Sequence, residues 1–297
     1  MATLTSGFVN VPTQKLDAWL GKVKGGSSIA ALSGAIPMKF GKGESMVFDI
    51  GEAEYVGEGQ DKGATTVTKA PQTVDPFKFH KTIRFNQEVL WADEDHQLEV
   101  VDQILEQIQP ALSRALDYGV IHGINPTGGA AVAAMTQKLA SATSIVTQAP
   151  GDKPYANVDA ADALVLANGF VPRDIALDPA FAAQFSGLRN ATSEQKLYPN
   201  FTLSEAVSAL DGHRSSVNRT VGAVGVAAVA SKLRGIVGDF SAVRWGIQKQ
   251  IGLELIQYGD PDGGGDLKRK NQVAFRAEVV YGWGIADLAA FALVKSA

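Results

Sequence analysis

Four histidines are the first candidates for chemistry, because an imidazole can bind a metal ion or carry a proton. His80, His96, His122 and His213 lie far apart, in segments of strand, helix and loop character. Zinc sites draw their ligands from short paired spacings, and these histidines show none. We therefore expect solvated or structural histidines. The chain has no cysteine, which excludes disulfides, thiolate metal sites and cysteine nucleophiles.

Three aspartates form the best candidate for a cation site. Asp260, Asp262 and Asp266 stand in the glycine-rich segment 259–266. Their spacing follows no known calcium loop, and exposed turns use aspartate and glycine for conformational reasons. A turn is the favoured interpretation, and calcium is the alternative.

Two carboxylate pairs could act in acid–base catalysis. Glu52 and Glu54 lie in a segment of strand character, where charges protect an exposed edge. Asp93 and Asp95 lie at the start of a predicted helix, where the positive end of the helix dipole favours them. The sequence also has no nucleophile elbow, zinc-protease motif, Walker loop or dinucleotide-binding motif. We therefore predict a protein that is not an enzyme, with no catalytic, cofactor-binding or metal-binding residues and no cofactor.

Composition limits the class of protein. The chain has 297 residues, of which 45% are hydrophobic and 20% charged, so it can bury a core. Its formal net charge of -4 argues against binding nucleic acid by charge neutralisation. The longest apolar runs, such as residues 221–230, are too short to cross a bilayer, and the N-terminus lacks the features of a signal peptide. We expect synthesis in a cytoplasm and no membrane partner.

The first half of the chain predicts parts that lack a core of their own. Residues 1–38 are broken by glycines and read as an arm anchored by Ile29, Leu32 and Ile36. Residues 44–56 and 64–85 alternate with period two and predict one long hairpin around the turn 57–63. A two-stranded ribbon is marginally stable alone, so we expect it to pack on a neighbouring subunit.

A long helix is predicted next, over residues 93–122. Apolar residues recur there at three- and four-residue steps, Pro110 should kink or break the helix, and Gly123 should end it.

The second half predicts a compact α/β region followed by a sheet. We expect a helix capped by Asn157, a strand at 175–177, a helix starting at Asp178-Pro179, and central strands at 221–230 and 233–240. Alternation then predicts strands around 251–255, 273–281 and 288–294, with a turn at 259–266.

The order of these parts resembles the tailed-bacteriophage major capsid protein of the Hong Kong 97 type, an α+β fold. Residues 79–90 (FHKTIRFNQEVL) are similar to the strand that leads into that family's spine helix. Residues 115–123 (ALDYGVIHG) are similar to the end of the helix, and 271–283 (NQVAFRAEVVYGW) with 290–292 (AFA) to the closing strands. The resemblance covers about residues 30–297.

The resemblance implies a division into parts. It gives an N-terminal arm (1–38), an extended loop (39–85), a peripheral domain with the spine helix (86–155), an axial domain (156–244) and the closing strands of the peripheral domain (245–297). Some relatives crosslink their subunits through a lysine–asparagine isopeptide bond. Lys62 lies near the hairpin tip, but no acceptor asparagine maps onto this sequence, so we expect overlap rather than crosslinks.

The resemblance also implies the partners. Copies of the chain would form hexamers and pentamers of an icosahedral or prolate head, assembled in the host cytoplasm and found in the virion. No fused scaffolding segment precedes the arm and the chain starts at Met1, so we expect a separate scaffold or none. A portal and decoration proteins are further partners, and double-stranded DNA would be packaged without sequence-specific binding. The alternatives are an encapsulin-type compartment shell and, from another class, an α/β enzyme with an unrecognised site.

Overall fold

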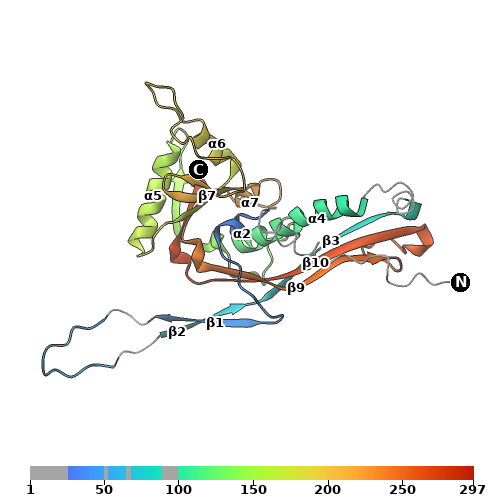
Figure 1. Cartoon of the computed structure of the whole chain (residues 1–297), viewed down its shortest axis with the longest axis horizontal. Coiled ribbons are helices and arrows are strands. Elements are labelled where there is room, and N and C mark those ends of the chain that lie inside the picture. Colours follow the sequence, from blue (N-terminus) through green and yellow to red (C-terminus); the bar gives the residue numbers. More distant parts are fainter. Residues whose placement is uncertain (1–25, 50–52, 65–67, 89–99) are drawn as a thin grey trace.

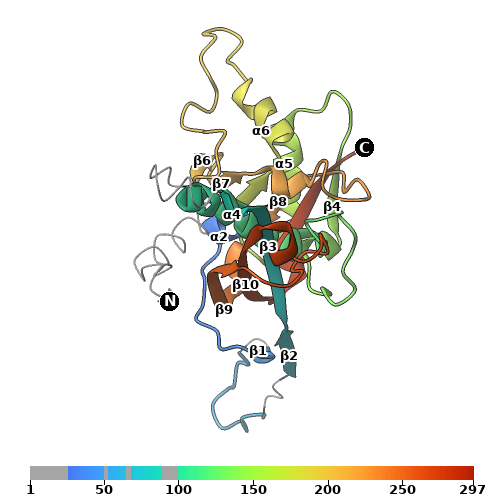
Figure 2. The ribbon, with the colours of Figure 1, turned by 90° about the vertical axis from the view of Figure 1, so that its right-hand side faces the viewer.

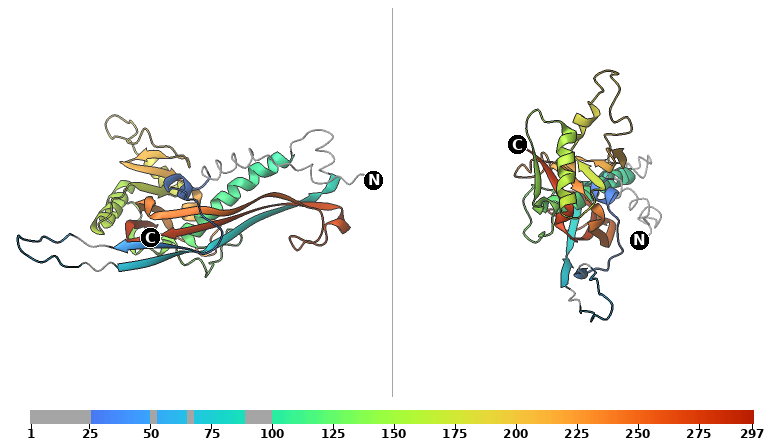
Figure 3. Two further views of the ribbon diagram at one scale, coloured as in Figure 1. Left: turned by 60° about the horizontal axis from the view of Figure 1, so that its bottom comes forward. Right: turned by 90° about the vertical axis from the view of Figure 1, so that its left-hand side faces the viewer.

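The computed structural model describes residues 26–49, 53–64, 68–88 and 100–297. The molecule is elongated, with a compact α/β part, a long narrow sheet beneath a long helix, and a thin ribbon that projects past the α/β part (Figure 1). Figures 2 and 3 show that the ribbon extends well away from the rest of the chain. The mixture of helix and sheet is the fold class that the sequence predicts.

The long sheet has three antiparallel strands in the order β3-β10-β9, namely β3 (Pro76–Asn86), β10 (Gln272–Ile285) and β9 (Val243–Ile256). Alternation placed the aromatic residues of β3 on one face, and this face packs against the core. Three aromatic contacts join β3 to β10: Phe77 to Trp283, Phe79 to Tyr281 and Phe85 to Phe275, with ring centroids 4.3, 6.0 and 5.3 Å apart.

The hairpin is shorter than predicted. Strand β1 (Gly43–Asp49) pairs with β2 (Thr68–Val74) as a two-stranded antiparallel sheet. The chain leaves the hairpin at Asp75, and β3 pairs with β10 instead. The prediction of one continuous hairpin to residue 85 is therefore wrong. Period-two alternation identifies the faces of a strand but not its partner, so the two strands could not be separated from sequence.

The long helix α4 (Val100–Asp117) runs over the sheet and contains Pro110 without interruption. It continues as a π-helical turn, Tyr118–His122, and ends at Gly123, whose φ of 66° is left-handed. The predicted end is confirmed. Of the two expectations for Pro110, a break is wrong and a kink stays a prediction. The start that we expected near Asp93 lies outside the described residues.

The compact part contains a six-stranded sheet in the order β4-β11-β8-β5-β7-β6. Its strands are β4 (Ser144–Gln148), β5 (Asp174–Leu177), β6 (Ser208–Leu210), β7 (His213–Val217), β8 (Leu233–Gly238) and β11 (Phe291–Ser296). The helices of this part are α5 (Pro154–Ala167), α6 (Pro179–Ser186) and α7 (Arg219–Gly222). The described residues also form a short helix α2 (Ser28–Leu32) and 3-10 turns at Leu139–Ser141, Phe240–Ala242, Lys268–Lys270 and Leu288–Ala290.

Strands β4 and β11 lie outside the 156–244 range that sequence reasoning gave to the α/β region, yet both belong to its sheet. Strand β11 pairs with β8 on one side and, in parallel, with β4 on the other. The domain boundaries expected at residues 155/156 and 244/245 therefore do not match the hydrogen bonds of this sheet. Strand β4 precedes the first boundary and β11 follows the second, yet both strands belong to the sheet.

The strands expected at 175–177 and 233–240 are confirmed as β5 and β8, and so is one helix cap, while two other local predictions in this part are wrong. Residues 221–230 form the end of α7 and a partly exposed loop, not a strand, because Ala223 and Gly225 adopt positive φ angles. Asn157 does not cap α5, which begins at Pro154; its amide donates to the Lys153 carbonyl from inside the helix. Asp178 does cap α6, accepting a hydrogen bond from Ala180 N.

Candidate assembly surfaces

Among the described residues, the contacts of the ribbon β1–β2 with the rest of the molecule lie near its root. Lys42 pairs with Asp75 at 3.0 Å, Gly41 N donates to Gln248 Oε1 at 3.1 Å, and Gln137 Nε2 donates to the Thr73 carbonyl at 2.9 Å. Residues 53–64 beyond it are largely exposed, and Tyr55 has 92% of its surface free. A two-stranded ribbon has little stability of its own, so this surface requires a partner.

A buried carboxylate holds the N-terminal segment in place. Asp117, at the end of α4, is fully buried. It accepts hydrogen bonds from the Ser27 hydroxyl, from Ser28 N at 3.0 Å and Ile29 N at 3.1 Å, and from Thr220 Oγ1 at 2.5 Å. The three backbone and hydroxyl donors of residues 27–29 lie at the start of the short helix α2 (Ser28–Leu32). One side chain therefore joins α2, α4 and α7.

Two opposing effects act on this carboxylate. Burial raises the pKa of Asp117, because the charged form loses its hydration, and the four donated hydrogen bonds oppose the rise.

Other polar groups also hold the N-terminal segment. Arg214 Nη2 donates to the Leu32 carbonyl at 2.9 Å, and the Ser216 hydroxyl donates to Ser28 Oγ at 3.2 Å. The predicted anchors Ile29 and Leu32 are buried in this chain's own core, while Ile36 is 37% exposed.

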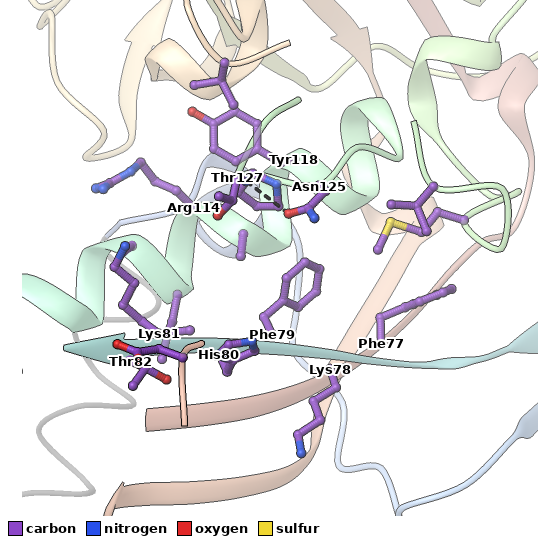
Figure 4. Close-up of a pocket in the computed structure, with 18 of the residues that line it drawn as sticks. Phe77, Lys78, Phe79, His80, Lys81, Thr82, Arg114, Tyr118, Asn125 and Thr127 are labelled. Atoms are coloured by element: carbon purple, nitrogen blue, oxygen red, sulfur yellow. Dashed lines mark hydrogen bonds between the residues drawn. The ribbon is translucent and has the colours of Figure 1, made fainter. Parts of the chain in front are cut away.

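A groove of about 800 Å³ opens between β3 and α4. Its floor is apolar, built by Phe77 and Phe79 from β3 and by Leu112 from α4, with Val132 and Met135 beside them. Figure 4 shows Phe77 and Phe79 pointing from the strand toward the helix, whereas Lys78 points to the opposite face. The rest of the lining is rich in charged and polar side chains, among them Lys81, Arg114 and Asp262.

The rim of the groove carries positive charge. Lys81 from β3 and Arg114 from α4 lie on the same side of the groove (Figure 4), and neither makes an ion pair with any residue that the structure describes. Asp262 also lines the groove, but it is paired with Arg84. The unpaired charges of the rim are therefore positive.

The three aspartates proposed as a calcium alternative have other partners. Arg84 Nη2 contacts Asp260 Oδ1 at 3.1 Å, and Arg84 Nε donates to Asp262 Oδ2 at 3.1 Å. Asp266 Oδ1 accepts from Arg269 N at 2.8 Å. The Arg84 guanidinium lowers the pKa of Asp262. Within the described ranges, no three histidine or acidic side chains are grouped so as to hold a metal ion.

The three described histidines lie in different parts of the fold. His122 is buried, donates from Nε2 to the Thr220 carbonyl at 3.0 Å, and has its pKa lowered by burial. His213 Nε2 lies 3.1 Å from Asp162 Oδ1, and this hydrogen bond raises the pKa of His213. His80 is exposed on β3. His96, Glu52, Asp93 and Asp95 lie outside the described residues.

Sequence reasoning missed Asp117, the groove and the exposed loop after α7. Asp117 lies within a segment quoted for its resemblance, but its donors come from residues 27–29 and 220, which only the fold brings to it. The loop exposes Val224 and Val229, at 66% and 83%, although its apolar composition suggested burial. No helix in the described ranges has the length and apolar composition to span a membrane.

Comparison with known proteins gives a family match over almost the whole chain. The model of the phage capsid family matches residues 7–296. No curated protein matches the sequence.

Solved structures agree with the family match. A chain from Mycobacterium phage Ogopogo is 41% identical over 92% of this chain and 92% of its own, with a TM-score of 0.80. One from Gordonia phage Cozz is 28% identical over 91% and 86%, with a TM-score of 0.74. A chain from the capsid of an empty GTA particle is 16% identical over 92% and 90%, with a TM-score of 0.58, and shares the fold. These matches confirm the expected fold and do not favour the encapsulin or enzyme alternatives.

Proposed function

The chain belongs to the phage capsid family, and from that premise we propose how this major capsid protein builds the head of a tailed bacteriophage. Copies of the chain self-assemble into hexamers and pentamers, and these close into an icosahedral or prolate shell around double-stranded DNA. The family match over residues 7–296 is the observation that carries the function. A ribbon whose described contacts lie at its root supports the mechanism, because such a part gains stability by lying on a neighbour.

The parts of the molecule have separate roles in this proposal. The compact part around the six-stranded sheet is the axial domain, whose copies meet at the centre of each capsomer. The three-stranded sheet with α4 is the peripheral domain, and the ribbon is the extended loop. Strands β4 and β11 are hydrogen-bonded into the axial sheet, so we assign residues 144–148 and 291–296 to the axial domain. Many moderate contacts between copies then add up to a stable shell.

The partners follow from this role. A portal completes the head, which assembles in the host cytoplasm with a separate scaffold protein or none before DNA is packaged, and decoration proteins are a further candidate partner. The formal net charge of -4 supports a container that holds DNA without condensing it onto basic tails. The absence of an identified acceptor asparagine for Lys62 supports overlap of subunits rather than covalent crosslinks, and the chain acts as a structural protein without a catalytic site.

Electron microscopy of the full-length protein tests the proposal. Expressed alone and with candidate scaffold proteins from the same genome, it should form closed particles or capsomers with five- and six-fold symmetry. Virions should contain it as their most abundant protein by mass spectrometry. A chain that stays a compact monomer under all these conditions, and is a minor component of virions, would contradict the proposal. Denaturing gels of the particles should show monomers, and a ladder of covalent oligomers would contradict assembly by overlap alone.

A further inference from the structure

His213 joins a hairpin at the edge of the six-stranded sheet to a helix. Strand β6 is the edge strand of this sheet and pairs with β7 alone among the described strands. Asp211 and Gly212 connect the two strands with positive φ angles of 50° and 85°, as a tight two-residue turn requires. His213 follows the turn, and its Nε2 lies 3.1 Å from Asp162 Oδ1 on α5. This contact ties the β6–β7 turn to α5.

The surroundings of the His213 ring suit a charged imidazolium. The side chain is buried, and Nδ1 makes no hydrogen bond with the residues that the structure describes. The Leu210 carbonyl, opposite His213 in the hairpin, also favours the charged ring, as does Asp162. A neutral imidazole donates from one nitrogen and leaves the other as an acceptor, whereas the imidazolium donates from both. Acceptors on both sides therefore favour the protonated ring.

Protonated His213 supplies the positive charge of this cluster. Arg214 is the next residue of β7, but it pairs with Asp174 of β5 at 2.7 Å. The other titratable groups around the turn are acids and phenols, namely Asp159, Asp162 and Tyr155 on α5, Asp211 in the turn and Tyr198 beyond it. Loss of the proton from His213 therefore leaves Asp162 without its cation.

The turn also supports a long loop, residues 188–207, which connects α6 to β6. Tyr198 of this loop donates from its hydroxyl to Asp211 Oδ2 at 3.4 Å. Its ring packs on Phe185 of α6, with ring centroids 5.8 Å apart. Figures 1 and 2 show the loop projecting from the compact part beyond α6. A change in the position of the turn therefore reaches the loop through Asp211 and Tyr198.

From these contacts we propose that His213 is a pH-sensitive clamp, which holds the β6–β7 turn and loop 188–207 against α5 while it is protonated and loosens them when it loses its proton. The hydrogen bond to Asp162 raises the pKa of His213 against the opposing effect of burial. The closed clamp therefore binds the proton more tightly than a freely solvated ring does. Its stabilisation is complete below the ordinary value of about 6.5 and is lost as the pH rises through the higher value of the closed form.

Amide hydrogen exchange of the full-length protein tests the clamp. The protein is kept in one assembly state, checked by sedimentation, and exchange is corrected for its intrinsic dependence on pH. Peptides covering residues 198–212 should exchange several-fold faster at about pH 8 than at about pH 6. Peptides from β5, a central strand of the same sheet, are the internal control and should not change. Equal protection of residues 198–212 at the two pH values would overturn the proposal.

Two variants show whether His213 is the group that titrates. His213→Gln keeps a donor for Asp162 but carries no charge, so its exchange over residues 198–212 should be the same at both pH values. His80→Gln, at an exposed position of β3, is the control and should keep the wild-type difference. Asp162→Asn covers the case in which His213→Gln does not fold, and it should reduce the difference. A full wild-type difference in either His213→Gln or Asp162→Asn would contradict the clamp.

Tyr198→Phe tests the connection from the turn to the loop. Without the hydroxyl, residues 208–212 should keep their pH-dependent exchange, while residues 198–203 should lose most of theirs. Unchanged pH dependence over residues 198–203 would show that Tyr198 does not transmit the change.

The clamp also has a consequence for assembly, and this step rests on the proposed function. Loop 188–207 exposes Leu197 and Leu203, at 47% and 54%, on the domain whose copies meet in a capsomer. A fixed loop costs less entropy to bind, so the wild type should form capsomers at a lower protein concentration at about pH 6 than at about pH 8. His213→Gln should show no such difference. Equal thresholds in the wild type would overturn this role in assembly, and absence of capsomers at every pH would overturn the proposed function, while hydrogen exchange still decides the clamp.

Discussion

The carboxylate of Asp117 accepts a hydrogen bond from the hydroxyl of Ser27, which lies ninety positions earlier in the chain. Ser28 N and Ile29 N donate to the same carboxylate, so it receives the free backbone donors at the start of α2. Thr220 donates from the other side. The point where the N-terminal segment meets the molecule is thus fixed by one buried side chain rather than by apolar contacts alone.

Asp117→Asn should therefore destabilise the protein. An amide has the same shape but turns one acceptor into a donor, which leaves buried donors at α2 without a partner. The expected loss is about 2–4 kcal/mol of the free energy of unfolding, measured by urea unfolding of subunits at constant pH. Asp287→Asn is the matched control, because Asp287 is exposed and caps a turn through Ala289 N, a role that asparagine also performs. Equal losses in the two variants would contradict the role of Asp117.

Gly129→Ala should be far more damaging than Gly128→Ala. Both glycines have positive φ angles, of 67° and 90°, so both variants carry backbone strain. A Cβ at 129 would lie 1.8 Å from the Val226 carbonyl oxygen, whereas one at 128 meets nothing within 4 Å. We expect a loss of about 1 kcal/mol at 128 from strain alone, and a clearly larger loss at 129, because backbone must move to relieve the clash.

Thermal unfolding of the two alanine variants and the wild type checks this prediction. It also tests whether the turn at 126–129 holds the loop after α7, since Ala228 N donates to the Gly129 carbonyl. Equal losses of stability at both positions would show that the loop after α7 moves to accommodate the added Cβ at 129 without a further loss of stability.

The parts that alternate in sequence could be predicted, because a strand with one buried face records that face in its residues. Strand β9 and the aromatic face of β3 were identified in this way. The apolar alternation also located β10, although both faces of that strand are buried. The partner of β3 could not be found, because alternation says nothing about which strand lies alongside. The role of Asp117 could not be predicted either. Its sequence neighbours indicate that it lies in a helix, but the hydrogen bonds that it accepts come from residues 27–29 and 220.

Apolar composition misled the prediction at residues 221–230. A run without charge suggests a buried strand, but small residues and glycine also suit a loop that leans on a neighbouring turn. Val226 and Ala227 pack against Tyr118 and Ile124, while Val224 and Val229 stay exposed. In a shell protein such exposure is less surprising, because the surface seen in one subunit includes surface that assembly covers.

Calcium should have no effect on the stability of the β9–β10 connection. Arg84 already pairs with both Asp260 and Asp262, and Asp266 accepts a hydrogen bond from the backbone of Arg269. The melting temperature should be the same in calcium and in chelator. Arg84→Gln removes the cation and leaves the carboxylates free, so a calcium-dependent rise in melting temperature is expected in this variant alone. A rise in the wild type that Asp262→Asn abolishes would restore the calcium interpretation.

The stability of the compact part should fall as the pH rises through neutrality, because of His213. Asp162 accepts a hydrogen bond from the His213 ring. This raises the pKa of His213 in the folded protein above its pKa in the unfolded chain, against the opposing effect of burial. The stabilisation is complete below the unfolded value of about 6.5 and is lost as the pH rises through the higher folded value. The wild type should therefore exceed Asp162→Asn in unfolding free energy by more at about pH 6 than at about pH 8. His80→Gln, at an exposed position on β3, is the control and should leave this pH dependence in place. A gap between the wild type and Asp162→Asn that is constant with pH would show that the pair contributes as a neutral hydrogen bond, without the imidazolium.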